Sequence, residues 1–224
     1  MANFSEMQRE TSILPMRDST PITIVDYGMG NIGSLINMFR RIGVQSEVAS
    51  DICTVERARK IMLPGVGAFG AAMDRIDALG LRGVLRAKAL EEQVPFMGIC
   101  LGMQLMTRTS EESPAARGLD LIPADTVRFP RATGLKVPHM GWNEVMVRTP
   151  TALTASLPQE PRFYFVHSYY VQADDPDDVM VRCHYGQDFD AGLNRGNIFG
   201  AQFHPEKSHK FGMAFLKGFA ELAC

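Results

Sequence analysis

The sequence predicts one α/β domain, in which a mainly parallel central sheet is covered by helices on both faces and extended by antiparallel strands. Two observations predict this fold class. Short apolar runs alternate with segments of helical spacing in the first half of the chain, and short β-like runs separated by Pro, Gly and Asp fill the second half. A chain of 224 residues, 46% of them hydrophobic, is long enough to bury such a core. We expect the domain to span residues 21–224 and residues 1–20 to form a poorly ordered extension.

The first half begins with an apolar strand at 22–26, followed by a helix that carries Leu35, Met38, Phe39 and Ile42 on one face. Gly43 ends that helix. The next expected elements are a strand at 45–49, a short helix at 54–60, a buried strand at 61–63, a glycine-rich loop at 64–70, a helical stretch at 71–93 broken around Gly80 and Gly83, a buried strand at 94–99 and a helix at 101–107. Such short alternating units are typical of a parallel sheet.

The second half contains shorter β-like runs and a final amphipathic helix. The runs are expected at 145–147, 163–166, 179–183, 190–193 and 198–203, and the helix at 210–222. Antiparallel additions to the same sheet explain this pattern better than a second domain does.

Charge and cysteine content exclude several classes of protein. The 23 Lys and Arg against 25 Asp and Glu give a net charge of −2, which argues against nucleic acid or a membrane surface as the main partner. No run approaches the roughly 20 apolar residues of a membrane span. The first twenty residues lack the pattern of a secretory signal, so we expect a cytoplasmic protein with reduced thiols. The four cysteines lack metal-ligand spacing, and we expect neither a metal nor an organic cofactor.

Cys100 stands where a buried strand runs directly into a helix, between Gly98 and Gly102. This is the pattern of a nucleophile elbow, with Cys in place of Ser, and its tight turn requires small neighbours. The unpaired N–H groups of a helix N-terminus favour the thiolate, and the Leu101 N–H points to where an oxyanion would form. The alternative is a buried structural cysteine. Cys53, Cys183 and Cys224 lack this setting and are expected to be structural or incidental.

A thiol nucleophile needs a base, usually a histidine held by a third group. His204 is the best candidate, because Pro205 biases it toward extended geometry, in which Glu206 shares its side of the chain. The carboxylate would then fix the tautomer of the imidazole. The alternative is a surface loop between a strand and a helix. His184 and His209 are assigned no role.

The segments GICLGMQ (98–104) and QFHPEKS (202–208) together resemble the class I, or triad, glutamine amidotransferases. The resemblance covers residues 21–222 and implies that family's three-layer fold, with Cys100, His204 and Glu206 as its Cys-His-Glu triad. The family's Pro-Gly-x-Gly oxyanion loop matches residues 64–67, where a peptide flip would present the Val66 N–H beside that of Leu101. The resemblance also implies a set of residues that hold glutamine: Gly65, Gly67, Gln104, Glu112, His167, Ser168 and Tyr169.

Three further motifs, ITIVDYGMGNIGSL (22–35), KVPHMGWNEV (136–145) and FYFVHSYYV (163–171), resemble the glutaminase subunits of imidazole glycerol phosphate synthase. That resemblance implies a 1:1 heterodimer with a (β/α)8 cyclase of histidine biosynthesis, to which ammonia from glutamine would pass. It places four residues at the interface with the partner: His139, Gly141, Trp142 and Asn143.

Several alternatives remain open from the sequence. Glu112 could be a solvated acid, His167 a strand-end histidine bonded to backbone, and Trp142 a core residue. A related subunit could supply ammonia to a sugar amidotransferase of bacterial surface polysaccharide synthesis, and the segment 209–213 departs from the commoner histidine-pathway pattern in that direction. A non-catalytic binding module and a cysteine peptidase are the rivals from other classes.

Overall fold

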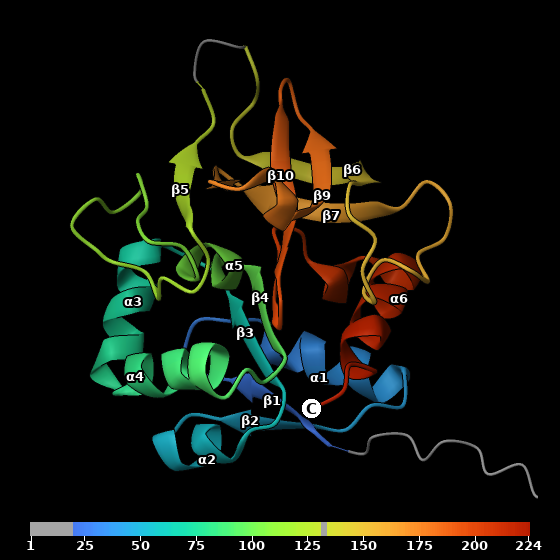
Figure 1. The fold of residues 1–224 in the computed structure, drawn as a ribbon. Coiled ribbons are helices and arrows are strands. Elements are labelled where there is room, and N and C mark those ends of the chain that lie inside the picture. Colours follow the sequence, from blue (N-terminus) through green and yellow to red (C-terminus); the bar gives the residue numbers. More distant parts are fainter. Residues whose placement is uncertain (1–19, 131–133) are drawn as a thin grey trace, which may run out of the picture.

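The computed structural model describes residues 20–130 and 134–224. Five strands form the parallel part of the sheet, in the order β2 (Ser46–Ala49), β1 (Ile22–Val25), β3 (Ile61–Gly65), β4 (Phe96–Cys100) and β11 (Ile198–Ala201). Each parallel pair is joined by a helical crossover, except where β11 returns from the second half of the chain (Figure 1). Because parallel strands share one direction, the carboxyl ends of β3, β4 and β11 lie together.

The antiparallel part continues from β11 through β10 (Asp188–Arg195), β9 (Val179–His184), β6 (His139–Val147) and β7 (Arg162–His167). A branch leaves this path, in which β8 (Tyr169–Ala173) pairs with both β10 and β5 (Ala124–Arg128). The predicted antiparallel additions are therefore confirmed as parts of one sheet, and they rise above the parallel strands in Figure 1.

Helices cover both faces of the parallel strands, which makes three layers (Figure 1). One face carries α2 (Ile52–Arg57), α3 (Phe69–Ala78), α4 (Leu81–Arg86) and α5 (Leu101–Leu105), and the other carries α1 (Ile32–Arg41) and α6 (His209–Ala220). A π-helical turn, η1 (Ala87–Glu91), continues α4, and the 3-10 turns η3 (Pro176–Asp178) and η4 (Pro205–Lys207) lie in the second half. The predicted α/β fold class is confirmed.

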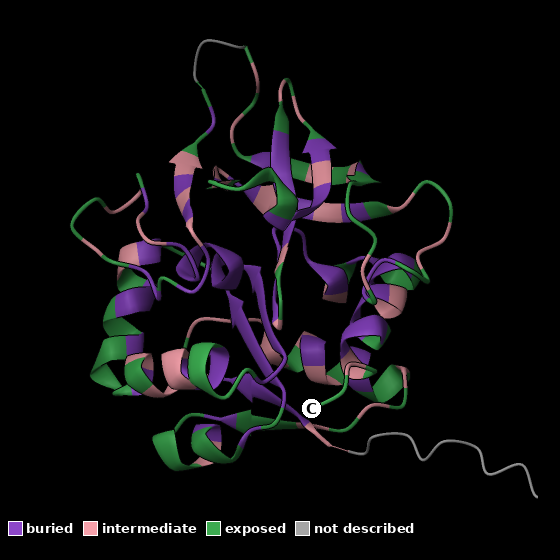
Figure 2. Cartoon of the chain, in the orientation of Figure 1, coloured by how far each residue is buried: buried purple, intermediate pink, exposed green. Residues whose placement is uncertain are grey.

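Alternation along the buried strands divides the apolar side chains between the two layers. On β3, Ile61 and Leu63 join the core under α3 and α4, while Met62 between them joins the core under α1 and α6. This follows from the two-residue period of a strand, whose successive side chains point to opposite faces. Figure 2 shows the result, with these strands buried along their length and the helices exposed only on their outer sides.

The structure departs from the expected elements in several places. Gly80 does end α3, with φ +67°, but Gly83 lies inside α4, and the predicted break there is wrong. The run expected at 145–147 is the end of the nine-residue strand β6, and β5 and β8 were not predicted. Strand β11 ends at Ala201, two residues before the predicted end.

The predicted N-terminal extension, residues 1–20, falls outside the described residues except for Thr20. Within the part of the chain that the structure describes, no helix has the length and apolar character needed to cross a membrane.

Candidate active site

Cys100 occupies a strained turn between β4 and α5. Its φ of +53° lies in the left-handed region, which side chains other than glycine rarely adopt. The turn closes so tightly that a Cβ on Gly98 would lie 2.6 Å from the Gly102 carbonyl oxygen, and a Cβ on Gly102 would lie 1.8 Å from the carbonyl oxygen of Leu63. The predicted need for small neighbours is therefore a steric necessity here, and the strain at Cys100 is typical of a functional position.

His204 and Glu206 are brought together immediately after β11. The Nδ1 atom of His204 lies 2.8 Å from Oε1 of Glu206, and both side chains are 2% exposed. His204 is extended, as Pro205 predicts, but 205–207 form the 3-10 turn η4. The expected reason for the pairing, a continuous extended segment, is therefore wrong: the turn carries the carboxylate back to the ring.

This turn is anchored to β7 by a set of short hydrogen bonds. The His204 N–H donates to the Tyr164 carbonyl at 2.9 Å, the Tyr164 N–H donates to Ser208 Oγ at 3.0 Å, and that hydroxyl donates to the His204 carbonyl at 2.6 Å. Because these bonds involve backbone groups of His204 itself, they fix the position of the imidazole relative to the sheet.

The other ring nitrogen, Nε2 of His204, is buried and has no hydrogen-bond partner among the described residues. His204 and Cys100 line the same cavity. Burial alone would lower the pKa of His204, but its interactions with the Cys100 sulfur and the Glu206 carboxylate outweigh burial and raise the pKa to about 9. The site therefore stabilises the imidazolium form of His204, which is the form that the ring has once it holds the thiol proton.

The cavity at the carboxyl ends of β3 and β4 has a volume of about 290 Å³. Its size suits a small amino acid rather than an extended peptide. Of the residues predicted for catalysis, the oxyanion position and substrate binding, Gly65 and Glu206 do not line this cavity. The other ten do: Val66, Gly67, Cys100, Leu101, Gln104, Glu112, His167, Ser168, Tyr169 and His204.

The loop after β3 lies beside the nucleophile because Gly65 and Cys100 are partners in the register of β3 and β4. The Val66 N–H donates to the Met29 carbonyl at 3.4 Å, so it is directed away from the expected oxyanion position. Leu101 begins α5, and its N–H belongs to the first helical turn, where no partner exists within the helix. In this conformation a second oxyanion donor requires rotation of the Gly65–Val66 peptide.

Tyr27 supports this loop through a hydrogen bond to its backbone. This residue was not predicted from the sequence. Its hydroxyl donates to the Pro64 carbonyl at 2.8 Å, and a Cβ on Gly65 would lie 2.5 Å from that hydroxyl. Burial raises the pKa of Tyr27, and the nearby Cys100 and Asp26 raise it further, so the phenol stays protonated and remains a donor. Tyr27 lies directly after a predicted strand and before Gly28, and this position at a strand end could have indicated a role near the site.

The side-chain amides of Gln104 and Gln202 are hydrogen-bonded to each other beside the Cys100 nucleophile. Gln104 Nε2 donates to the Tyr169 carbonyl at 3.0 Å and to Gln202 Oε1 at 3.1 Å, and Gln202 Nε2 lies 3.8 Å from the Cys100 sulfur. Gln202 is fully buried and was also missed from the sequence. Its place two residues before His204 in a β-like run could have indicated that it shares the His204 side of the chain.

Glu112 is half-buried at the cavity wall, where Oε2 accepts the N–H of Phe69, the first residue of α3, at 2.7 Å. It therefore satisfies a helix N-terminus, and the alternative of a freely solvated acid is wrong. His167 bonds to the Tyr169 carbonyl at 2.8 Å, so the alternative of a strand-end histidine bonded to backbone describes its contact, although the ring also lines the cavity.

The four residues expected at a partner interface all lie on β6 but differ in how far they are exposed. Trp142 is 47% exposed on β6 and stacks on His209 at 5.4 Å, so the alternative of a core tryptophan is wrong. Gly141 and Asn143 are half-buried, and Asn143 Nδ2 donates to the His184 carbonyl at 2.9 Å. The side chain of His139, however, is only 3% exposed. Its ring packs inward against Phe165 and Tyr185, so this side chain adds little to the exposed surface, and its assignment to the interface remains a prediction.

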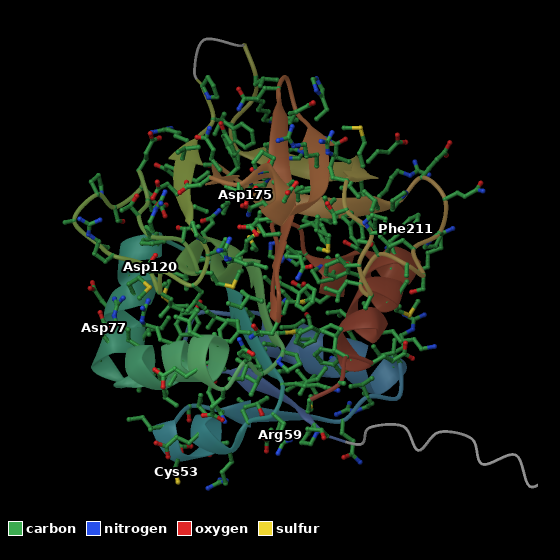
Figure 3. All side chains as sticks on the ribbon, viewed as in Figure 1. Cys53, Arg59, Asp77, Asp120, Asp175 and Phe211 are labelled. Atoms are coloured by element: carbon green, nitrogen blue, oxygen red, sulfur yellow. The ribbon has the colours of Figure 1, made fainter. Side chains whose placement is uncertain are left out.

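The three other cysteines lie away from this site. Cys183 is buried on β9, where burial raises the pKa of its thiol to about 12. Cys224 is exposed, as is Cys53, which Figure 3 shows on α2 at the opposite end of the molecule from the antiparallel strands. Among the described residues no group of three or more His, Cys, Asp or Glu side chains is arranged to hold a metal ion.

Comparison with known structures supports the fold alone, because the identities are low. The crystal structure of a glutamine amidotransferase superposes on this chain with a TM-score of 0.68 at 18% identity, and the superposition covers 89% of this chain and 99% of the other. The PurLQS structure from Thermotoga maritima gives a TM-score of 0.67 at 18% identity, covering 89% and 97% of the two chains.

Comparison with families and curated proteins is more specific. The model of the glutamine amidotransferase class-I family matches residues 23–221. Imidazole glycerol phosphate synthase subunit HisH 2 of Pseudomonas aeruginosa is 47% identical over 90% of this chain and 99% of its own length, and subunit HisH of Moorella thermoacetica is 46% identical over 90% and 95%. The chain therefore belongs to the class I glutamine amidotransferases and, among them, to the family of the imidazole glycerol phosphate synthase HisH subunits.

Proposed function

We propose that this chain is the glutaminase subunit of an imidazole glycerol phosphate synthase, which hydrolyses glutamine to glutamate and passes the ammonia to a cyclase subunit. The observation that carries the proposal is Cys100 in its strained turn, on the same cavity wall as a histidine whose ring is bonded to Glu206 at 2.8 Å. The names of the relatives supply the acceptor pathway.

In the proposed mechanism, Nε2 of His204 takes the proton of the Cys100 thiol, and the thiolate attacks the side-chain carboxamide carbon of glutamine. The C=O electrons move to oxygen, where the N–H groups of Leu101 and Val66 stabilise the oxyanion. His204 then protonates the leaving nitrogen, the C–N bond breaks, and ammonia departs. The neutral His204 then takes a proton from the water that attacks the glutamyl thioester, and it returns this proton to the Cys100 sulfur as glutamate leaves. Glu206 stabilises the imidazolium each time it forms.

We propose that glutamine is held by Gly65, Gly67, Gln104, Glu112 and the backbone of 167–169. The loop at 65–67 is a two-state element in this scheme. In the conformation described, the Val66 N–H is bonded to the Met29 carbonyl, so the isolated chain has one oxyanion donor. Loss of one such donor typically costs roughly 100- to 1,000-fold in rate. A partner that favours the rotated peptide would therefore activate hydrolysis, which avoids waste of glutamine when no acceptor is present.

The proposed partner is a (β/α)8 cyclase in a 1:1 heterodimer in the cytoplasm, which would use the ammonia to form imidazole glycerol phosphate and aminoimidazole carboxamide ribonucleotide. Direct transfer is needed because free ammonia becomes ammonium in bulk water. We assign the exposed Trp142, with Gly141 and Asn143, to the face that receives this partner. The domain is proposed to span residues 21–224, and the mechanism requires neither a metal nor an organic cofactor.

The test is glutamate release by the purified chain, alone and with a histidine-pathway cyclase and its ribonucleotide ligand, with Cys100→Ala as the blank. Stimulation on the order of a hundredfold or more is expected, because the missing oxyanion donor is restored. Turnover that the cyclase does not raise would contradict the partnership and favour the sugar-amidotransferase acceptor.

A further inference from the structure

Two buried histidines, His139 and His167, lie opposite each other on β6 and β7, and the mechanism uses neither ring as an acid or base. Nδ1 of His139 lies 3.0 Å from Nε2 of His167. The His139 ring is sandwiched between Phe165 and Tyr185, at centroid distances of 4.8 and 4.0 Å and an angle of 22° to each. This packing leaves the ring little freedom to rotate.

The hydrogen-bond partners determine where the protons are on both rings. The Tyr169 carbonyl can only accept, so Nδ1 of His167, 2.8 Å away, carries a proton. Burial lowers the pKa of His167 to about 3 and that of His139 to about 4, so both rings are neutral at pH 7. Nε2 of His167 is then an acceptor, and Nδ1 of His139 must be its donor. Nε2 of His139 is left to accept from Asn143 Nδ2 at 3.4 Å.

The series of bonds ends at the wall of the glutamine cavity. The Tyr169 carbonyl accepts from His167 and also from Gln104 Nε2 at 3.0 Å, so both of its lone pairs are used. The same Gln104 amide donates to Gln202, which lies against the Cys100 sulfur. If the His167 ring left this carbonyl, the backbone of 167–169 would lose one of the two donors that hold it.

We propose that His139 is a positioning residue for glutamine: its Nδ1–H holds the His167 ring on the Tyr169 carbonyl and thereby fixes the 167–169 wall of the cavity. The inference rests on the proposed function, since it takes glutamine as the molecule that this wall contacts. His139 touches neither the nucleophile nor the expected substrate, so its effect is on glutamine affinity rather than on the chemical step.

The first arm of the test is long-range ¹H–¹⁵N NMR of the histidine rings in the isolated chain at pH 7. Both His139 and His167 are expected as the neutral Nδ1–H tautomer. In the His139→Phe variant, which keeps an aromatic ring between Phe165 and Tyr185, His167 is expected to lose its single tautomer. A charged ring, or an Nε2–H tautomer at His139, would overturn the proposal.

The second arm measures glutamine binding by calorimetry in a Cys100→Ala background, which cannot turn over substrate. His139→Phe is expected to raise the Kd for glutamine about tenfold. The matched control is His184→Phe, the same exchange on an exposed side chain, which should leave the Kd unchanged. If His139→Phe fails to fold, Asn143→Ala removes the donor to His139 Nε2 and should raise the Kd about threefold.

A third measurement separates positioning from general damage. The rate at which iodoacetamide alkylates Cys100 in the His139→Phe chain should stay within about twofold of wild type, because the elbow is untouched. An unchanged Kd for glutamine in His139→Phe would overturn the inference. Absence of glutamine binding in the Cys100→Ala parent would instead contradict the proposed function, while the ring spectra would still decide the histidine pairing.

Discussion

The parallel and antiparallel parts of the sheet build the site in different ways. On the parallel side, Cys100 is positioned by backbone geometry, and Gly98 and Gly102 contribute by having no side chain. On the antiparallel side, His167 lies at the cavity wall and its buried ring is paired with the buried ring of His139. The first part should therefore be sensitive to added volume, and the second to the loss of a single hydrogen-bond donor.

The largest effect is expected from Gly102→Ala, because the new Cβ would lie 1.8 Å from the Leu63 carbonyl oxygen. Backbone must move on both β3 and α5, so the free energy of unfolding should fall by about 3 kcal/mol or more. Urea unfolding measures this. The control is Gly33→Ala in α1, where a Cβ meets nothing within 4 Å and a gain of about 0.5–1 kcal/mol is expected. Equal midpoints for Gly102→Ala and wild type would refute volume sensitivity.

The next largest effect is expected from Glu206→Gln, measured as glutamine hydrolysis against pH in the complex with the cyclase. Wild-type activity should fall as the pH rises through about 9, because His204 loses the proton that the leaving ammonia needs. Without the carboxylate the imidazolium is less stable, so the fall should begin at a lower pH and the maximal rate should drop on the order of 100-fold.

Glu221→Gln, a substitution on an exposed side chain, is the control for that profile. A Glu206→Gln profile that falls at the same pH as wild type would show that the 2.8 Å contact does not tune His204.

An intermediate effect is expected at Glu112, which lies between α5 and β5 and accepts the N–H of Phe69 at the start of α3. In Glu112→Gln the amide oxygen can still accept this bond, so stability should stay within about 0.5 kcal/mol of wild type, whereas Glu112→Ala should lose about 1 kcal/mol. Both variants should bind glutamine more weakly. Equal unfolding free energies for the Ala and Gln variants would show that the helix cap contributes nothing.

The smallest effect is expected from His209→Ala. The chain has a single tryptophan, so fluorescence excited at the long-wavelength edge, where tyrosine does not absorb, reports on Trp142 alone. Removing the ring that stacks on it at 5.4 Å should shift the emission to longer wavelength as water reaches the indole, with less than about 0.5 kcal/mol change in stability. Lys210→Ala is the control on the same helix, and an emission maximum that does not differ between the two variants would mean that the stack is not formed in solution.

The same contrast explains what could be predicted from the sequence. The parallel half was predictable because buried β-branched runs, helix spacing and glycines are local signals, and the Cys100 turn is encoded within five residues. The antiparallel half depends on pairings between distant segments. Nothing local in 124–128 indicates that it becomes β5, which forms by pairing with β8. The inward rotation of His139 likewise depends on Phe165 and Tyr185, which come from other segments.

Cys100 as the nucleophile that attacks glutamine can be tested by intact-mass and peptide-mass analysis of the chain after incubation with the glutamine analogue 6-diazo-5-oxo-L-norleucine. A nucleophilic cysteine displaces nitrogen from this compound and keeps the rest as a stable thioether. We expect one adduct, on Cys100, that glutamine suppresses and that is absent from Cys100→Ala. An adduct on Cys53, Cys183 or Cys224 instead, or glutamate release by a chain that forms no adduct, would contradict it.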